Sequence, residues 1–128
     1  MKQSAAAWWP VGAWVIVILA LTGFQLPRLV GASGSQLDKL VHFGMYFGLG
    51  WTLARAARIS GLRTALAAAG LIAGGIVFAG LDELLQRWVP RRAPDMADWL
   101  ADVAGLVTAY ALYAATWRRR WKSGAGRA

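Results

Sequence analysis

The chain has 128 residues and no cysteine, which excludes a disulfide framework, a thiolate metal site and a cysteine nucleophile. Charged residues are also scarce, at 16% of the chain, whereas 58% of the residues are hydrophobic. The apolar residues come in long runs, while a soluble domain shows short alternations of apolar and polar residues. A water-soluble fold of this length cannot bury so much apolar surface, so the composition predicts an integral membrane protein.

The apolar runs are long enough to cross a bilayer. Because an α-helix rises 1.5 Å per residue, about 20 residues cross the hydrocarbon core. We therefore expect an all-α bundle of four transmembrane helices that forms a single membrane domain over residues 1–128. No small-x-small cleavage site follows the first run, which favours an uncleaved helix over a signal peptide. The expected spans are residues 8–26, 38–57, 64–86 and 96–117.

Local signals mark the ends of these spans. Ser35 and Asp38 form an S-x-x-D capping box at the start of the second span. Asp95 has a residue type and a position suited to cap the fourth span. After this span, the basic tail of residues 118–128 is expected to be disordered.

The basic residues predict the orientation of the four spans. With four crossings both termini lie on one side, and this side has nine basic residues and no acidic residue. The other side has five basic residues and all six acids. The positive-inside rule then places both termini in the cytoplasm. The net charge of +8 comes from residues at span ends, where anionic lipid head groups contact them, so we expect membrane lipids and no nucleic acid as partners.

Polar residues gather at the outer ends of the second, third and fourth spans. Their spacing of three and four residues places them on one face of each helix. Because a charged side chain inside the bilayer costs a few kcal/mol, these faces should meet each other or a wet cavity. We therefore expect a polar vestibule that opens outward. Its members are Asp38, Lys39, His42 and Tyr46, then Asp82, Glu83 and Gln86, then Arg91, Arg92, Asp95, Asp98 and Asp102.

The order of these residues resembles the VanZ-like family of bacterial membrane proteins over residues 37–112. The chain departs from the family pattern at Asp102, where asparagine is usual, and at Arg91, where glycine is usual. The resemblance implies a cell-envelope protein of the bacterial cytoplasmic membrane, and the founding member is associated with glycopeptide, chiefly teicoplanin, resistance. It implies no particular reaction. The matching motifs are Asp38-Lys39-x-x-His42-Phe43-x-x-Tyr46, Asp82-Glu83-x-x-Gln86, Val89-Pro90-x-Arg92 and Asp98-x-x-x-Asp102-x-x-Gly105.

Among these residues, Asp82 and Glu83 are the best candidates for chemistry, because two acids at the C-terminal end of a helix oppose its dipole. His42 is the single histidine, and it can carry a proton, bind a metal or a phosphate, or join two helices by a hydrogen bond. These three residues are the catalytic candidates. The candidate ligand-binding residues are Asp38, Lys39, His42, Tyr46, Asp82, Glu83, Gln86, Arg92, Asp98 and Asp102.

Several of these side chains also have structural roles open to them. Lys39 can extend to the interface or pair with a carboxylate such as that of Glu83. Gln86 can orient one of the two acids before it or a ligand, and Arg92 can bind phosphate or carboxylate. Asp102 lies deeper and requires a partner, for which Arg92, Lys39 and His42 are the candidates.

Three functions fit the sequence. The first is a binder of a lipid-linked or anionic envelope component. The second is a carboxylate and histidine enzyme, a hydrolase or transferase acting on an amphiphilic substrate, which can use Mg²⁺, Mn²⁺ or Ca²⁺. No H-E-x-x-H motif or G-x-S-x-G elbow supports it, so no cofactor is predicted. The third is a structural subunit or scaffold, with a homo-oligomer or a membrane-protein partner. Ion transport is disfavoured because the inner halves of the spans carry no acids.

Overall fold

The computed structural model describes residues 2–23, 35–90 and 93–124. Over these ranges the chain is helical, without a strand, which confirms the all-α prediction. The helices are α1 (Lys2–Gly23), α2 (Gln36–Ile59), α3 (Ala65–Leu85) and α4 (Met96–Gly124). A short 3₁₀ helix, η1 (Gln86–Trp88), follows α3 directly.

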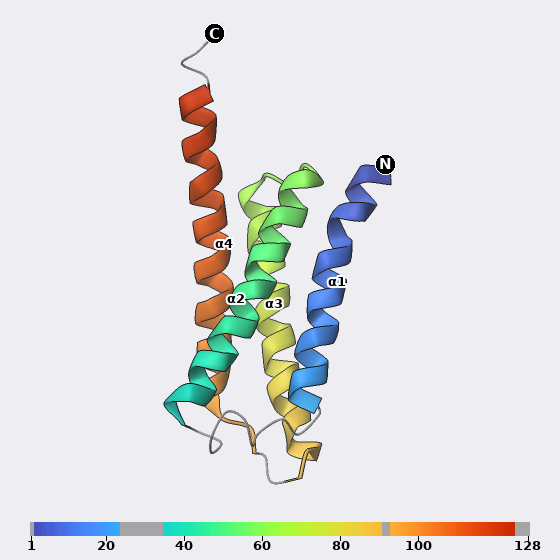
Figure 1. Ribbon diagram of the computed structural model, residues 1–128, viewed down its shortest axis with the longest axis vertical. Helices are drawn as coiled ribbons and strands as arrows, with labels where there is room; N and C mark the ends of the chain where they lie inside the picture. Colours follow the sequence, from blue (N-terminus) through green and yellow to red (C-terminus); the bar gives the residue numbers. More distant parts are fainter. Residues whose placement is uncertain (1, 24–34, 91–92, 125–128) are drawn as a thin grey trace.

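The four helices run alternately up and down along one axis (Figure 1). The start of α1, the end of α2, the start of α3 and the end of α4 lie at one end of the bundle. The start of α2, the end of α3 and the start of α4 lie at the opposite end. The most extensive contact joins α2 to α4, while α1 packs mainly on α2 and α3 mainly on α4. The pair α2 and α4 is therefore the centre of the fold.

Glycines permit the close contact between α2 and α4. A Cβ atom built on Gly105 would collide with the backbone of Phe43 and Phe47 on α2. One built on Gly50 would collide with the backbone of Leu106 on α4. Small residues allow two helix backbones to touch in this way, and the touching surfaces then carry van der Waals attraction that lipid chains cannot replace.

The predicted caps are present. The hydroxyl of Ser35 accepts a hydrogen bond from the amide of Asp38 at 3.1 Å, and Asp95 accepts one from the amide of Ala97 at 2.8 Å. At the end of α2, Gly61 has a φ of 76°, and the amide of Leu62 donates to the carbonyl of Ala57. This is the hydrogen bond of a Schellman motif, in which glycine adopts the left-handed conformation at little cost. Sequence signals therefore set these helix ends correctly.

Three helical segments are long and apolar enough to cross a membrane: Ala5–Gly23, Ala65–Trp88 and Met96–Trp117. Large apolar side chains also point outward on every helix, including Ile16, Leu40, Leu66 and Leu100. An apolar exterior of this kind suits a lipid environment. The second expected span, residues 38–57, lies within α2 but does not meet the same standard of hydropathy, because α2 carries Asp38, Lys39 and several further polar residues.

The structure corrects the expected end of the fourth span. Helix α4 continues to Gly124, so residues 118–124 are helical, although we expected the tail from residue 118 to be disordered. Arginine and lysine have high helix propensity, and neither proline nor glycine interrupts the chain between Trp117 and Gly124. The last four residues of the expected tail lie outside the described residues.

Candidate functional site

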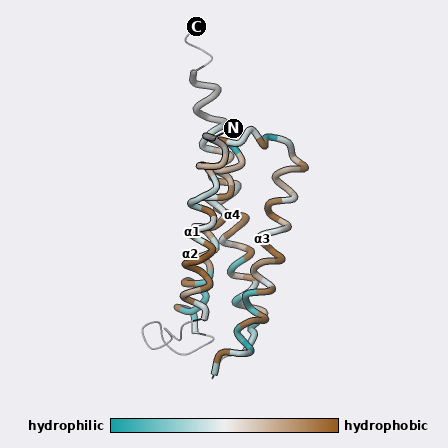
Figure 2. The backbone as a smooth tube through the Cα atoms, turned by 90° about the vertical axis from the view of Figure 1, so that its right-hand side faces the viewer, coloured by the Kyte–Doolittle hydropathy of each residue, from teal (hydrophilic) through white to brown (hydrophobic). Residues whose placement is uncertain are grey.

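A buried group of polar side chains lies where α2 begins, α3 ends and α4 begins. Figure 2 shows hydrophilic segments toward this end of the bundle. Five of the six acids are buried here, and none of them is more than 7% exposed. The described members of the expected set therefore come together as a buried cluster of side chains. The polar cluster consists of Asp38, His42, Tyr46, Asp82, Glu83, Gln86, Asp98 and Asp102.

The pair of His42 and Asp102 lies at the centre of the polar cluster. Nδ1 of His42 is 3.0 Å from Oδ1 of Asp102, and the side chains are 2% and 1% exposed. Of the candidate partners of Asp102, His42 is therefore one that the structure shows, while Arg92 lies outside the described residues. The second carboxylate oxygen of Asp102, Oδ2, is buried and has no hydrogen-bond partner among the described residues. Such an oxygen is uncommon in a folded protein and requires an explanation.

Glu83 connects the end of α3 to the start of α4. Its Oε2 accepts a hydrogen bond from the side-chain amide of Gln86 at 2.9 Å. Its Oε1 accepts one from the backbone amide of Asp95 at 2.7 Å. Gln86 therefore orients one of the two adjacent acids, as the sequence suggested. The link to Asp95 was not anticipated, because a backbone donor twelve residues away leaves no trace in the residue pattern.

Asp82 faces the other side, toward α1 and α2. It accepts hydrogen bonds from Thr22 at 2.9 Å and from the hydroxyl of Tyr46 at 3.3 Å. The hydroxyl of Thr22 also lies 2.9 Å from the carbonyl of Ile18 and has only one proton to donate to the two acceptors. Sequence reasoning missed Thr22, and the only signal was a lone polar residue near the end of an apolar run. Both acids are buried, but Asp82 contacts α1 and α2 while Glu83 contacts the start of α4.

Lys39 carries positive charge at the edge of the polar cluster. Its Nζ is 3.4 Å from Oδ1 of Asp98 and 3.8 Å from Oδ2 of Asp95, and its side chain is 27% exposed. Lys39 therefore pairs with carboxylates, which is one of its two expected roles, and these carboxylates lie at the start of α4. The oxygens of Glu83 accept from Gln86 and Asp95, while Lys39 extends toward the first turn of α4.

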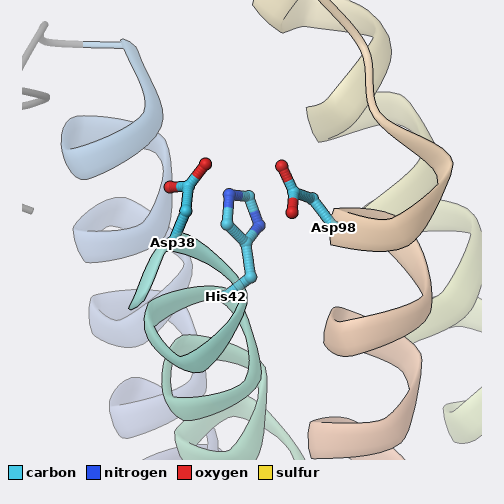
Figure 3. A group of neighbouring side chains, drawn as sticks. All are labelled: Asp38, His42 and Asp98. Atoms are coloured by element: carbon cyan, nitrogen blue, oxygen red, sulfur yellow. The ribbon is translucent and has the colours of Figure 1, made fainter. Parts of the chain in front are cut away.

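Two overlapping groups in the polar cluster have the donor atoms of a metal site. One ligand atom each from Asp38, His42 and Asp98 lie within 4.8 Å of one another, and so do those of His42, Glu83 and Asp102. Figure 3 shows the ring of His42 between the carboxylates of Asp38 and Asp98. The histidine belongs to both groups. Arg91 and Arg92, which we expected beside them, lie outside the described residues.

A cavity of about 370 Å³ lies near the opposite end of the bundle, between α2, α3 and α4. Its lining is mainly alanine and aromatic side chains, together with Arg58 and Arg63. The guanidinium of Arg58 lies over the ring of Trp117, 3.2 Å from its centroid. This cavity shares no residue with the polar cluster. The polar cluster, which contains the residues predicted from the sequence, is therefore the candidate functional site.

Membrane-length helices, an apolar exterior and a buried polar cluster at one end define a helical membrane protein. The chain belongs to the VanZ/LLP1 family, whose sequence model matches residues 3–118. This match confirms the VanZ-like resemblance and extends it over most of the chain. Neither the curated proteins nor the solved structures include a match to this sequence.

Proposed function

We propose that the polar cluster binds the polar head group of a lipid-linked component of the bacterial cell envelope. One observation carries this proposal: buried polar side chains from three helices converge at one end of an apolar bundle, and Oδ2 of Asp102 is left without a described partner. Ionisable residues within a membrane protein are costly and usually mark a binding or transport site. The apolar helices hold the lipid chain of such a ligand in the bilayer while the cluster contacts its head group.

The charge of the polar cluster favours a head group that donates hydrogen bonds. Five carboxylates are buried in the polar cluster, where Lys39 pairs with Asp98 and His42 contacts Asp102. Carboxylates accept hydrogen bonds, so sugar hydroxyls, amides or amines suit them better than a bare anion. Arg92 is proposed to contact the phosphate of the lipid linkage. The founding member of the VanZ-like family is associated with teicoplanin resistance, and a ligand in the cell envelope agrees with this association.

We also propose four spans, with both termini in the cytoplasm and the polar cluster at the outer face of the cytoplasmic membrane. Helix α2 has 24 residues and lies against α1 and α4. Its first acid and its histidine are buried, which removes them from contact with lipid. The bundle end that holds the start of α1 and the end of α4 also carries the excess of basic residues, as the positive-inside rule requires of the cytoplasmic side.

The absence of native cysteine makes this topology directly measurable. We expect a membrane-impermeant maleimide to label Ala93→Cys in intact spheroplasts, and Ala5→Cys and Arg63→Cys only after permeabilisation. All three positions are exposed in the structure. Ala5 and Arg63 are on the same side only if α2 spans the membrane. If only one of these two positions is labelled from outside, α2 does not span the membrane. If both are labelled from outside, the orientation is opposite to the one proposed.

The binding proposal is tested by native mass spectrometry of protein purified in a mild detergent. We expect one lipid-linked species to remain bound to the wild type. Occupancy should fall about tenfold in Glu83→Gln and Asp102→Asn, because a hydrogen bond to a charged group contributes roughly 1.5–3 kcal/mol. Arg55→Gln also neutralises one charged side chain, of opposite sign, at an exposed position near the opposite end, and it should retain the lipid.

A wild type that retains no envelope lipid would contradict this function. If the cluster variants also unfold while Arg55→Gln does not, the result would favour the structural alternative, in which the polar cluster only joins the helices. If Asp102→Asn retains the lipid at the wild-type level, the carboxylate of Asp102 does not contribute to lipid binding.

A second candidate function, catalysis, draws on the pair of His42 and Asp102. A buried carboxylate 3.0 Å from an imidazole orients the ring as a general base requires. The binder leaves the mass of the retained lipid unchanged, whereas a hydrolase or transferase converts it. Incubation of the purified protein with the lipid it retains, followed by mass spectrometry of the lipid, separates these two functions.

A further inference from the structure

We infer that His42, Glu83 and Asp102 bind a divalent transition-metal cation. Each of these residues comes from a different helix, and one ligand atom of each lies within 4.8 Å of the other two. Ligand atoms that share a metal lie about 2.0–2.2 Å from it, so they are at most roughly 4.4 Å apart. The three donors are therefore close to the separation that a shared ion requires. All three side chains are buried, at 2%, 5% and 1% exposure.

The second carboxylate oxygen of Asp102 is a further observation that favours a cation at this position. Its Oδ1 is occupied by the imidazole of His42, whereas Oδ2 is buried without a described partner. A buried carboxylate oxygen that has lost its water and gained no donor is unfavourable. A cation beside Oδ2 would satisfy its lone pairs directly.

The charge of the polar cluster points to the same ligand. Asp38, Asp82, Glu83, Asp98 and Asp102 are all buried, while Lys39 is half-buried at the edge and pairs with Asp98 and Asp95. Buried carboxylates are stable when they are paired with positive charge or coordinate a metal. A divalent ion held by His42, Glu83 and Asp102 would add two positive charges among these carboxylates.

The surroundings of the three ligands already hold them in position. Each oxygen of Glu83 accepts one hydrogen bond, from Gln86 or from the amide of Asp95, and a carboxylate oxygen has a second lone pair for a metal. Nδ1 of His42 and Oδ1 of Asp102 lie 3.0 Å apart, so a bound ion would take the place of the proton that they share. Gln86 and the amide of Asp95 are outer partners that hold the carboxylate of Glu83. Outer partners of this kind orient the ligands of known metal sites.

The alternative group of Asp38, His42 and Asp98 is less suited to a cation. Asp98 is 3.4 Å from the ammonium group of Lys39, whose positive charge repels a metal ion at the same carboxylate. Figure 3 shows that the carboxylate of Asp98 lies on one side of the His42 ring and that of Asp38 on the other. Glu83 instead accepts from Gln86 and the amide of Asp95, and Asp102 contacts the imidazole of His42.

The donor set also indicates the class of metal. One imidazole nitrogen with carboxylate oxygens suits Mn²⁺ or Zn²⁺, whereas Mg²⁺ and Ca²⁺ favour oxygen ligands alone. Such a cation would let an acidic cluster contact the phosphate of a lipid-linked ligand. This last step rests on the proposed function, but binding of the ion itself does not and is tested without lipid.

The test uses full-length protein in detergent, purified without a polyhistidine tag, treated with chelator and titrated with Mn²⁺ alone. Electron paramagnetic resonance should show one tightly bound ion per chain, displaced by Zn²⁺. Glu83→Gln and Asp102→Asn should weaken binding at least tenfold. Asp98→Asn, a matched control within the same cluster, and Arg55→Gln near the opposite end should change it less than about threefold.

A spectroscopic measurement on the wild type alone tests the site even if the variants do not fold. His42 is the single histidine of the chain, so an imidazole nitrogen coupling to bound Mn²⁺ in the wild type can come only from His42. Absence of this coupling, or no binding by folded wild type, would overturn the inference. Loss of binding in Asp98→Asn with retention in Glu83→Gln would do so as well. Lipid retention is measured separately, so failure of the metal site and failure of the proposed function are distinguishable.

Discussion

Replacing Gly105 by alanine is expected to destabilise the bundle strongly, although the change adds only one methyl group. The new Cβ atom would collide with the backbone of Phe43 and Phe47, which cannot rotate away as a side chain can. Helices α2 and α4, which make the most extensive contact of the fold, would have to separate. Such overpacking costs roughly 1–3 kcal/mol and sometimes more. Unfolding of the purified protein in mixed micelles, followed by circular dichroism, measures the change.

Gly70→Ala on α3 is the matched control, because nothing lies within 4 Å of a Cβ atom built there. Alanine has a higher helix propensity than glycine by about 1 kcal/mol, so this variant should be as stable as the wild type or more stable. The two alanine substitutions should therefore have effects of opposite sign. Equal effects of both would show that α2 and α4 do not touch at Gly105.

His42→Leu is expected to have a still larger effect on stability when metal is removed by chelator. The leucine takes away the one described partner of Asp102 and leaves a buried carboxylate without compensation. Loss of one member of a buried pair costs about 3–5 kcal/mol. The free energy of unfolding in mixed micelles, measured with excess chelator, should fall by this amount, and the yield of folded protein should fall with it.

The double variant His42→Leu with Asp102→Leu gives the decisive comparison. It removes the carboxylate as well, so it should be more stable than His42→Leu alone, despite carrying one more substitution. The two effects are expected to be strongly non-additive because the side chains are in direct contact at 3.0 Å. Additive effects would show that the two residues do not form a pair in the folded protein.

Residue spacing was sufficient to predict the elements of the fold. The runs of apolar residues predict helices at the observed places, because a helix in lipid must satisfy its backbone internally and expose apolar side chains. The caps at Ser35 and Asp95 are local hydrogen bonds between neighbours in the chain, so their residue types predict them directly. The prediction of a disordered tail did not take account of the helix propensity of residues 118–124, which continue α4.

The candidate site was predicted as a set of residues but not as a set of contacts. Spacing of three and four residues places Asp38 and His42 on one helix face, and Asp98 and Asp102 on another. Which donor meets which carboxylate depends on how far each helix is rotated and shifted against its neighbours. The sequence accordingly left three partners open for Asp102 and did not indicate that Lys39 pairs with Asp95 and Asp98.

For this protein, the sequence by itself determined the class, the four helices and the residues that gather at one end, because hydropathy and helical periodicity are properties of each segment alone. Only the tertiary structure decided that Asp102 pairs with His42, that Thr22 of α1 donates to Asp82, and that Glu83 accepts from the amide of Asp95. These contacts join different elements of the bundle, and the backbone approach at Gly50 and Gly105 brings together α2 and α4, the helices that carry His42 and Asp102. Helix packing is a property of the whole bundle, so no segment read alone contains it.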